Sequence, residues 1–150
     1  MQTSSSNISQ AHQELQRAYL LVGFGHLTEA IAACERAECL MPEEALPGTL
    51  KGAILTASGQ LPAAMRQLQK VLRVHRDDLL ATLYLAEACF LAGRHRRAWR
   101  LLDGLDPHVL NESPHGPLAA ALRETWEQIP PDELPKPLEV NLDEEPQPAA

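Results

Sequence analysis

The stretch GHLTEAI, residues 25–31, opens on a glycine that recurs 34 residues later as Gly59 and again as Gly93. An alanine follows each glycine after five residues, and a small residue precedes each by seven. These small residues are Ala30, Ala64 and Ala98, and Ala18, Gly52 and Ala86. Three columns of small residues in one 34-residue frame indicate an internal repeat.

Each repeat divides into two amphipathic helical segments, because apolar residues recur at spacings of three and four on both sides of the glycine. The glycine can adopt the left-handed conformation that ends a helix, so the turn is tight. The expected first helices cover residues 9–22, 46–57 and 79–91. The expected second helices cover residues 27–40, 62–74 and 94–105. The small residues mark the points where paired helices cross closely.

These residues resemble the tetratricopeptide repeat (TPR) family over residues 9–107. The matching residues of the first repeat are Gly25-His26-Leu27-Thr28-Glu29-Ala30-Ile31, Ala37, Leu40 and Pro42. The family pattern prefers large apolar residues where this chain has Glu14 and Arg17. The resemblance implies an all-α fold of three helix-turn-helix repeats in a right-handed superhelix, followed by a C-terminal capping helix.

The two ends of the chain differ from the repeats. We expect residues 1–8 to form a flexible N-terminus and residues 9–129 to form the TPR domain. A stripe of apolar residues at helical spacing, which ends at Trp126 and Ile129, predicts a capping helix over 116–129 with Trp126 in the core. Residues 130–150 hold six prolines and few large apolar groups, so we expect a disordered tail rich in proline and acid.

The net charge of −7 is concentrated at the C-terminal end, because residues 130–150 hold six acids and one lysine. The rest of the chain is nearly neutral, unlike the basic domains that bind nucleic acid through the phosphate backbone. No apolar run approaches the roughly 18 to 20 residues of a membrane helix, and the N-terminus lacks the pattern of a signal peptide. We expect a cytoplasmic protein with no membrane insertion and no nucleic-acid partner.

The sequence carries no recognisable catalytic or metal motif. It contains no HExxH, no GxSxG and no pair of cysteines with zinc spacing. The stretch Gly23-Phe24-Gly25 lacks the third glycine of a dinucleotide loop. Cys34, Cys39 and Cys89 match no metal or redox spacing and are expected to be buried free thiols. We therefore expect no enzyme, no cofactor and no metal.

A basic cluster lies in the second half of the repeats. Residues 66–100 contain eight basic and three acidic side chains. Its members are Arg66, Lys70, Arg73, Arg76, Arg94, Arg96, Arg97 and Arg100. Most lie on second helices, which the TPR resemblance places on the outside of the superhelix. The cluster is either a solvated convex face or a docking surface for the acidic tail or for an acidic partner.

The TPR resemblance also implies that the first helices line a concave groove. The repeat register predicts that this groove is lined by Leu15, Tyr19, Val22, Leu46, Thr49, Ala53, Thr56, Leu80, Leu83, Glu87 and Phe90. The set is mostly apolar, and it lacks the Lys, Asn and Arg with which TPR co-chaperones hold a carboxylate. It therefore predicts binding of an extended or helical apolar peptide segment of a client protein, with Glu87 able to select a basic residue.

The same groove residues permit two other interpretations. They could be core, or they could be covered by the tail or by a second copy in a homodimer. A small acidic chain with three repeats and an apolar groove is similar to the TPR chaperones of bacterial type III secretion systems. That resemblance implies a cytoplasmic chaperone or adaptor. The alternative is a structural scaffold subunit whose groove is permanently filled in a larger assembly.

Overall fold

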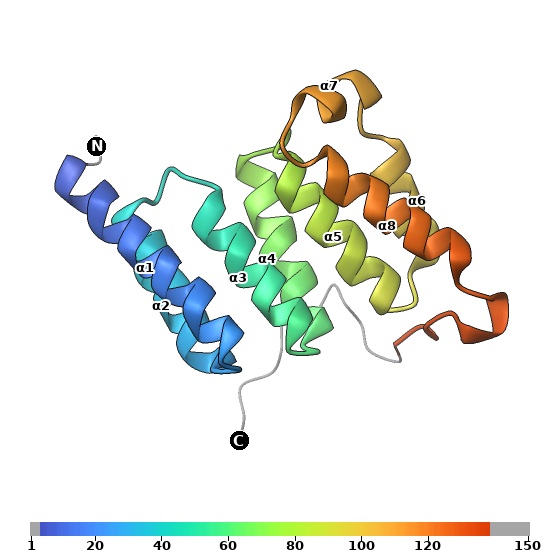
Figure 1. Cartoon of the computed structure of the whole chain (residues 1–150), viewed down its shortest axis with the longest axis horizontal. Coiled ribbons are helices and arrows are strands. Elements are labelled where there is room, and N and C mark those ends of the chain that lie inside the picture. Colours follow the sequence, from blue (N-terminus) through green and yellow to red (C-terminus); the bar gives the residue numbers. More distant parts are fainter. Residues whose placement is uncertain (1–3, 139–150) are drawn as a thin grey trace.

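A computed structural model describes residues 4–138, in which three helical hairpins stand side by side (Figure 1). The hairpins pair α1 (Ser5–Gly23) with α2 (Leu27–Leu40), α3 (Leu46–Ala57) with α4 (Leu61–Val74), and α5 (Leu79–Leu91) with α6 (His95–Asp103). A short helix α7 (Pro107–Glu112), the capping helix α8 (Gly116–Gln128) and a 3-10 turn at Pro131–Glu133 follow. The predicted all-α repeat fold is confirmed.

The three hairpins share one turn. Gly25, Gly59 and Gly93 each have φ of 80°, a region that residues with a Cβ rarely adopt. At the first turn the Gly25 N–H donates to the Val22 carbonyl at 3.0 Å, and the His26 N–H donates to the Leu21 carbonyl at 2.9 Å. The same pair of hydrogen bonds recurs at the other two glycines. This Schellman arrangement satisfies the last carbonyls of each first helix and starts the second helix immediately.

The first helix begins earlier than the sequence predicts. The Ser4 hydroxyl accepts a hydrogen bond from the Asn7 N–H at 3.2 Å and caps α1, which starts at Ser5. The prediction of a flexible N-terminus is therefore wrong for residues 5–8, while residues 1–3 lie outside the described part of the chain. The other five helices of the hairpins begin and end within two residues of their predicted bounds.

The apolar core consists of two clusters that meet at α3. One holds α1 and α2 together and includes Ile54, and the other extends from Leu55 through α4, α5 and α6 to α8. The predicted crossing points are all buried. A Cβ added at Gly52 would lie 2.5 Å from the Leu68 side chain, so the close approach of α3 and α4 requires glycine there.

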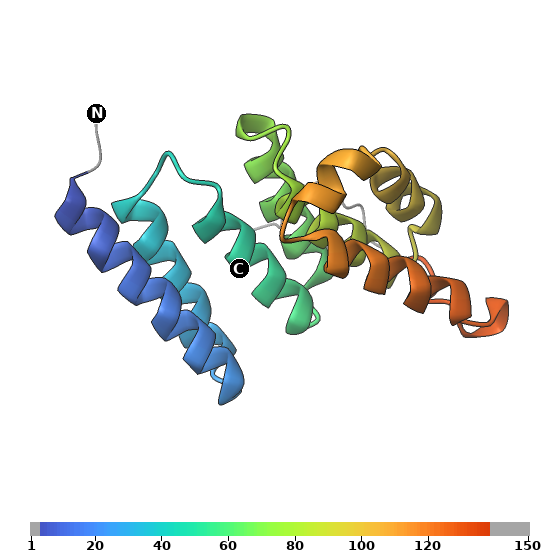
Figure 2. The ribbon, with the colours of Figure 1, turned by 45° about the horizontal axis from the view of Figure 1, so that its top comes forward.

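The capping helix closes the last repeat. Figures 1 and 2 show α8 beside α5 and α6, where the Trp126 ring stacks on Phe90 with centroids 4.5 Å apart. Trp126 also meets the edge of Trp99 at 5.4 Å. The Arg123 guanidinium pairs with the Asp103 carboxylate at 2.7 Å and ties α8 to α6. The prediction that Trp126 belongs to the core is confirmed, because only 6% of it is exposed.

Residues 130–138, which we call the strap, fold back across the turn between α5 and α6. The Pro135 carbonyl accepts from the His95 ring at 2.8 Å, and the Leu138 N–H donates to the Ala92 carbonyl at 3.1 Å. Leu134 and Leu138 pack on the main core cluster. The prediction of a disordered tail is therefore wrong for these residues. Prolines reduce the entropy lost on ordering, and the packing of two half-buried leucines stabilises the otherwise exposed segment. Residues 139–150, the rest of that predicted tail, lie outside the described residues.

The three cysteines divide by burial. Cys34 and Cys89 are fully buried, as predicted. Cys39 is exposed, so the prediction of burial is wrong for this residue. Burial, with a contribution from the charge of Glu38, raises the pKa of the Cys34 thiol to about 11. Burial also raises the pKa of Cys89. Two of the three thiols are therefore poor nucleophiles at neutral pH.

Alkylation of the folded protein is expected to modify Cys39 alone. At pH 7.5, brief treatment with iodoacetamide should add one label per chain, because the other two thiols are buried and protonated. Intact mass followed by peptide mapping checks this. Three labels in denaturant provide the control, and rapid labelling of Cys34 without denaturant would contradict its burial.

Replacement of Gly93 by alanine is expected to destabilise the protein more than the same change at Gly59. Both glycines have positive φ, so each change costs about 1–2 kcal/mol in the free energy of unfolding. Among the described residues, a Cβ at Gly59 would meet nothing within 4 Å, whereas one at Gly93 would collide with the backbone of Lys136 and Pro137. Urea denaturation measures the difference, and faster exchange of the Leu138 amide in Gly93→Ala alone would show that the strap has been displaced. Equal losses for the two variants would contradict the contact.

Candidate functional site

An apolar pocket of about 180 Å³ lies between the first helices of the first two repeats. We call it the α1–α3 pocket. It is lined by Leu15, Ala18, Tyr19 and Val22 from α1, and by Leu50, Ala53, Ile54 and Ala57 from α3. The Tyr19 phenol is the one polar side-chain group among these eight residues. The volume lies below the roughly 300–1,000 Å³ of most small-molecule sites. The pocket therefore fits an apolar side chain of a partner better than a cofactor.

Tyr19 forms the outer rim of this pocket. Its side chain is 81% exposed, while Leu15 is only 8% exposed and forms the floor. Two more large apolar residues at the same end of α1, Leu20 and Phe24, are 60% and 78% exposed. An apolar hollow with an exposed aromatic side chain at its rim is typical of an interaction site, whereas Leu20 and Phe24 do not line the pocket.

Four of the predicted groove residues come together in the α1–α3 pocket, and seven do not line it. Leu15, Tyr19, Val22 and Ala53 line it. Leu46 is exposed elsewhere on α3, and Leu80 and Glu87 are half-buried on α5. The remaining four are buried in the core, so their prediction as surface contacts is wrong: Thr49, Thr56, Leu83 and Phe90.

Contacts in the structure account for three of these four corrections. The Thr49 and Thr56 hydroxyls donate to the carbonyls of Ala45 and Gly52, each at 2.9 Å, so both are satisfied within their own helix. Phe90 is covered by the stacked ring of Trp126. The capping helix therefore fills the position at which a further repeat would otherwise extend the groove.

Four pocket residues were absent from the predicted set, and the repeat register could have found them. They are Ala18, Leu50, Ile54 and Ala57. Leu50 and Ile54 correspond, 34 residues earlier, to Gln16 and Leu20, which lie on the flank of α1 that has no neighbouring repeat. Each first helix has one flank toward the preceding repeat and another toward the next. The residues that line a pocket between two repeats therefore occupy different positions of the repeat on α1 and on α3.

Glu87 is the charged member of the predicted groove. Burial raises the pKa of its carboxyl, and it forms no ion pair within residues 4–138. Burial and the negative charge of Glu87 together raise the pKa of the nearby Tyr84. Ionised Glu87 is therefore desolvated without a compensating cation, and a basic side chain from a partner would relieve that cost.

The substitution Glu87→Gln is expected to stabilise the free protein at neutral pH. The pKa of Glu87 is higher in the folded chain than in the unfolded chain, where it is about 4.5, so the folded chain keeps the proton to a higher pH. The native chain therefore loses stability as the pH rises from the unfolded pKa through the folded pKa. Glutamine has no ionisable carboxyl group, so the variant does not lose this stability. Urea denaturation from pH 4 to pH 8 should show similar midpoints at the acid end and a growing advantage for Glu87→Gln above it. A constant difference across that range would contradict the assignment.

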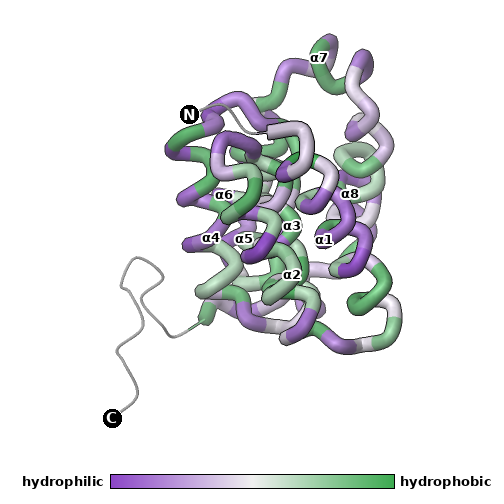
Figure 3. The backbone as a smooth tube through the Cα atoms, turned by 90° about the vertical axis from the view of Figure 1, so that its left-hand side faces the viewer, coloured by the Kyte–Doolittle hydropathy of each residue, from purple (hydrophilic) through white to green (hydrophobic). Residues whose placement is uncertain are grey.

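The basic cluster lies on the second helices and the turns beside them. Six of its eight members are exposed, and Arg66 and Arg97 are half-buried. Figure 3 shows α4 and α6 along one side of the molecule, where both carry hydrophilic segments. The two helices that carry most of the cluster therefore lie on the same side of the molecule.

Comparison with known proteins finds a family match for part of the repeats. Residues 55–123 match the family model described as "Tetratricopeptide repeat". No curated protein gave a match to the chain. The matched range runs from α3 into α8 and includes only Ala57 of the α1–α3 pocket.

The match covers less than half of the chain, and together with the all-α fold it supports TPR-like helical repeats. Such repeats indicate a protein–protein interaction module, and they are typically non-catalytic. Within residues 4–138, no cluster of three metal-ligating side chains is present. In the same range, no helix has the length and apolar character needed to cross a bilayer.

Proposed function

We propose that this TPR chain binds an apolar segment of another protein in the α1–α3 pocket and acts as a small cytoplasmic chaperone or adaptor for that segment. The observation that carries the proposal is the uncharged lining of the pocket beside the exposed Tyr19 ring. A carboxylate would be desolvated there without a cation to pair with it, whereas a leucine or phenylalanine would be buried favourably.

The size of the pocket limits what it contributes alone. Full burial of one large apolar side chain is worth about 1.5–3 kcal/mol, which is too little for a specific complex. The partner segment therefore needs further contacts, and two exposed side chains offer them: Tyr19 at the rim of the pocket, and Leu46, which lies outside the pocket at the start of α3. A segment with two or three apolar anchors, one of them in the pocket, matches this surface.

The narrower class that we propose is a chaperone like those of type III secretion systems. Three repeats, small size and an apolar interaction surface support it. Such a chaperone would withhold the apolar segment of an export client from self-assembly until a competing surface removes it. This function requires binding that is reversible and a chain that stays in solution without its client.

A structural scaffold subunit is the second candidate. It is favoured by Leu20 and Phe24, which face away from the second repeat and leave the outer flank of α1 uncovered. A neighbouring subunit of a larger assembly would bury that flank permanently. The two candidates differ in whether the partner exchanges.

Tyr19→Asp is expected to weaken partner binding more than tenfold, with Leu20→Asp as its matched control. Both positions are exposed, so neither change should unfold the chain, but only Tyr19 lines the pocket. A photo-crosslinking amino acid at position 19 in the native host would identify the client segment. Fluorescence anisotropy with that segment as a synthetic peptide then gives the two affinities.

Wild-type affinity in Tyr19→Asp would refute the pocket as the binding site. A larger loss in Leu20→Asp than in Tyr19→Asp would move the interface to the outer flank of α1 and favour the scaffold. Exchange of labelled for unlabelled peptide within minutes would support the chaperone, since a permanent subunit does not exchange.

A further inference from the structure

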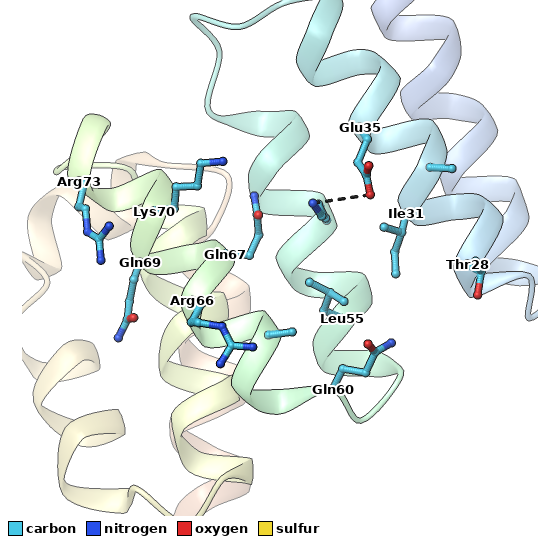
Figure 4. A pocket seen from close by; sticks show the side chains of 13 residues that line it. Thr28, Ile31, Glu35, Leu55, Gln60, Arg66, Gln67, Gln69, Lys70 and Arg73 are labelled. Atoms are coloured by element: carbon cyan, nitrogen blue, oxygen red, sulfur yellow. Dashed lines mark ion pairs between the residues drawn. The ribbon is translucent and has the colours of Figure 1, made fainter. Parts of the chain in front are cut away.

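A second hollow, larger than the α1–α3 pocket, lies between the second helices of the first two repeats. This α2–α4 seam encloses about 900 Å³. Figure 4 shows α2 on one side and α4 on the other, with α3 between them. The lining is Thr28, Ile31, Ala32 and Glu35 from α2, Lys51 and Leu55 from α3, and Gln60, Ala63, Arg66, Gln67, Gln69, Lys70 and Arg73 from α4 and the turn before it.

The charge of the seam is positive along α4. Lys70 and Arg73 are exposed, and neither forms an ion pair within residues 4–138. The seam's one acid, Glu35, is already paired with Lys51 at 3.6 Å. The seam therefore offers uncompensated cations above an apolar base that includes Ile31 and Leu55. An occupant that fits it is acidic and carries a few apolar side chains.

The chain's own C-terminal segment has that composition. Residues 139–150 read EVNLDEEPQPAA and contain four acids and no base. Val140 and Leu142 lie between the first acid and the acidic run, and they supply the apolar side chains. The charge and the apolar content of this segment both complement the seam.

The strap ends beside the turn between α5 and α6, so residues 139–150 begin at the end of the molecule where the glycine turns lie. The strap runs from His95 at the start of α6 to Ala92 at the end of α5, and so toward the second repeat. All three glycine turns lie at the same end of the hairpins (Figure 1). Gln60, the seam residue nearest that end of α4, directly follows Gly59, and apart from the chain neighbours of Gly59 no atom of residues 4–138 lies within 4 Å of a Cβ added there.

The length of the segment is also sufficient. Twelve extended residues span up to about 40 Å. The 14 residues of α4 form a helix of about 21 Å, at a rise of 1.5 Å per residue. The segment can therefore pass the Gly59 turn and still follow most of the seam.

We propose that residues 139–150 dock in the α2–α4 seam of the same chain, with their carboxylates against Lys70 and Arg73. The strap and the docked segment then form one continuous C-terminal arm along the second-helix side. The arm neutralises the basic face of α4 and leaves the α1–α3 pocket, on the first-helix side, open for a partner.

Paramagnetic relaxation enhancement in the full-length chain tests the arm. A nitroxide is attached at Gln147→Cys in a Cys39→Ser background, where Cys34 and Cys89 stay unlabelled because they are buried. Amide signals of seam residues on α2 and α4, such as Glu35 and Lys70, should broaden. At about 1 M salt, where the Debye length falls to about 3 Å, the broadening should drop by at least half.

Charge reversal in the seam, with an equal reversal elsewhere, provides the control. Lys70→Glu with Arg73→Glu should abolish the broadening, whereas Arg96→Glu with Arg100→Glu, which makes the same charge change on exposed positions of α6, should leave it. Reversing the charges of the segment by Asp143→Lys with Glu144→Lys and Glu145→Lys should restore the broadening in the variant that carries Lys70→Glu with Arg73→Glu.

Three results would overturn the proposal. One is the absence of broadening at the seam in the wild-type segment. Another is an equal loss of broadening in both double variants, which would indicate that net charge alone attracts the segment. The third is broadening of isotope-labelled chains by spin-labelled chains mixed with them, which would show that the segment docks on a second copy.

Discussion

The left-handed glycine at the centre of each hairpin is the constraint on which the architecture depends. Because Gly25, Gly59 and Gly93 share one backbone conformation and one pair of turn hydrogen bonds, the three hairpins leave their turns in the same direction. Stacking them therefore gathers the turns at one end and separates the first helices from the second. The pocket, the seam and the strap each occupy a place that this arrangement creates.

The 34-residue spacing predicted the hairpins well because the signals that form them are local. Glycine turns, small crossing residues and apolar spacing all act within one repeat. The strap was missed since its composition favours disorder, and its order depends on a distant surface. Leu134 and Leu138 contact the core only because α5, α6 and their turn are already in place, and no residue near them in the sequence signals this.

The site was predicted less well than the fold for a related reason. One helical face was assigned to all three repeats, which holds for Tyr19 and Ala53 but fails for Phe90. A repeat exposes a given face only if its neighbour leaves that face open. The last repeat is closed by Trp126, whereas the wider junction of α1 with α3 leaves a hollow. Identical register positions therefore differ in exposure, and the difference lies in the neighbour and not in the repeat.

The two hollows differ in chemistry although they share α3. Ile54 lines the uncharged α1–α3 pocket, and the next residue, Leu55, lines the basic α2–α4 seam, because consecutive helical residues point about 100° apart. Each α3 residue that lines a hollow thus lines one of them only, whereas a displacement of α3 as a whole would change both hollows. Positions on the outer helices, such as Tyr19 and Lys70, each belong to one hollow only. Substitutions on these outer helices can therefore test the two proposed binding activities separately.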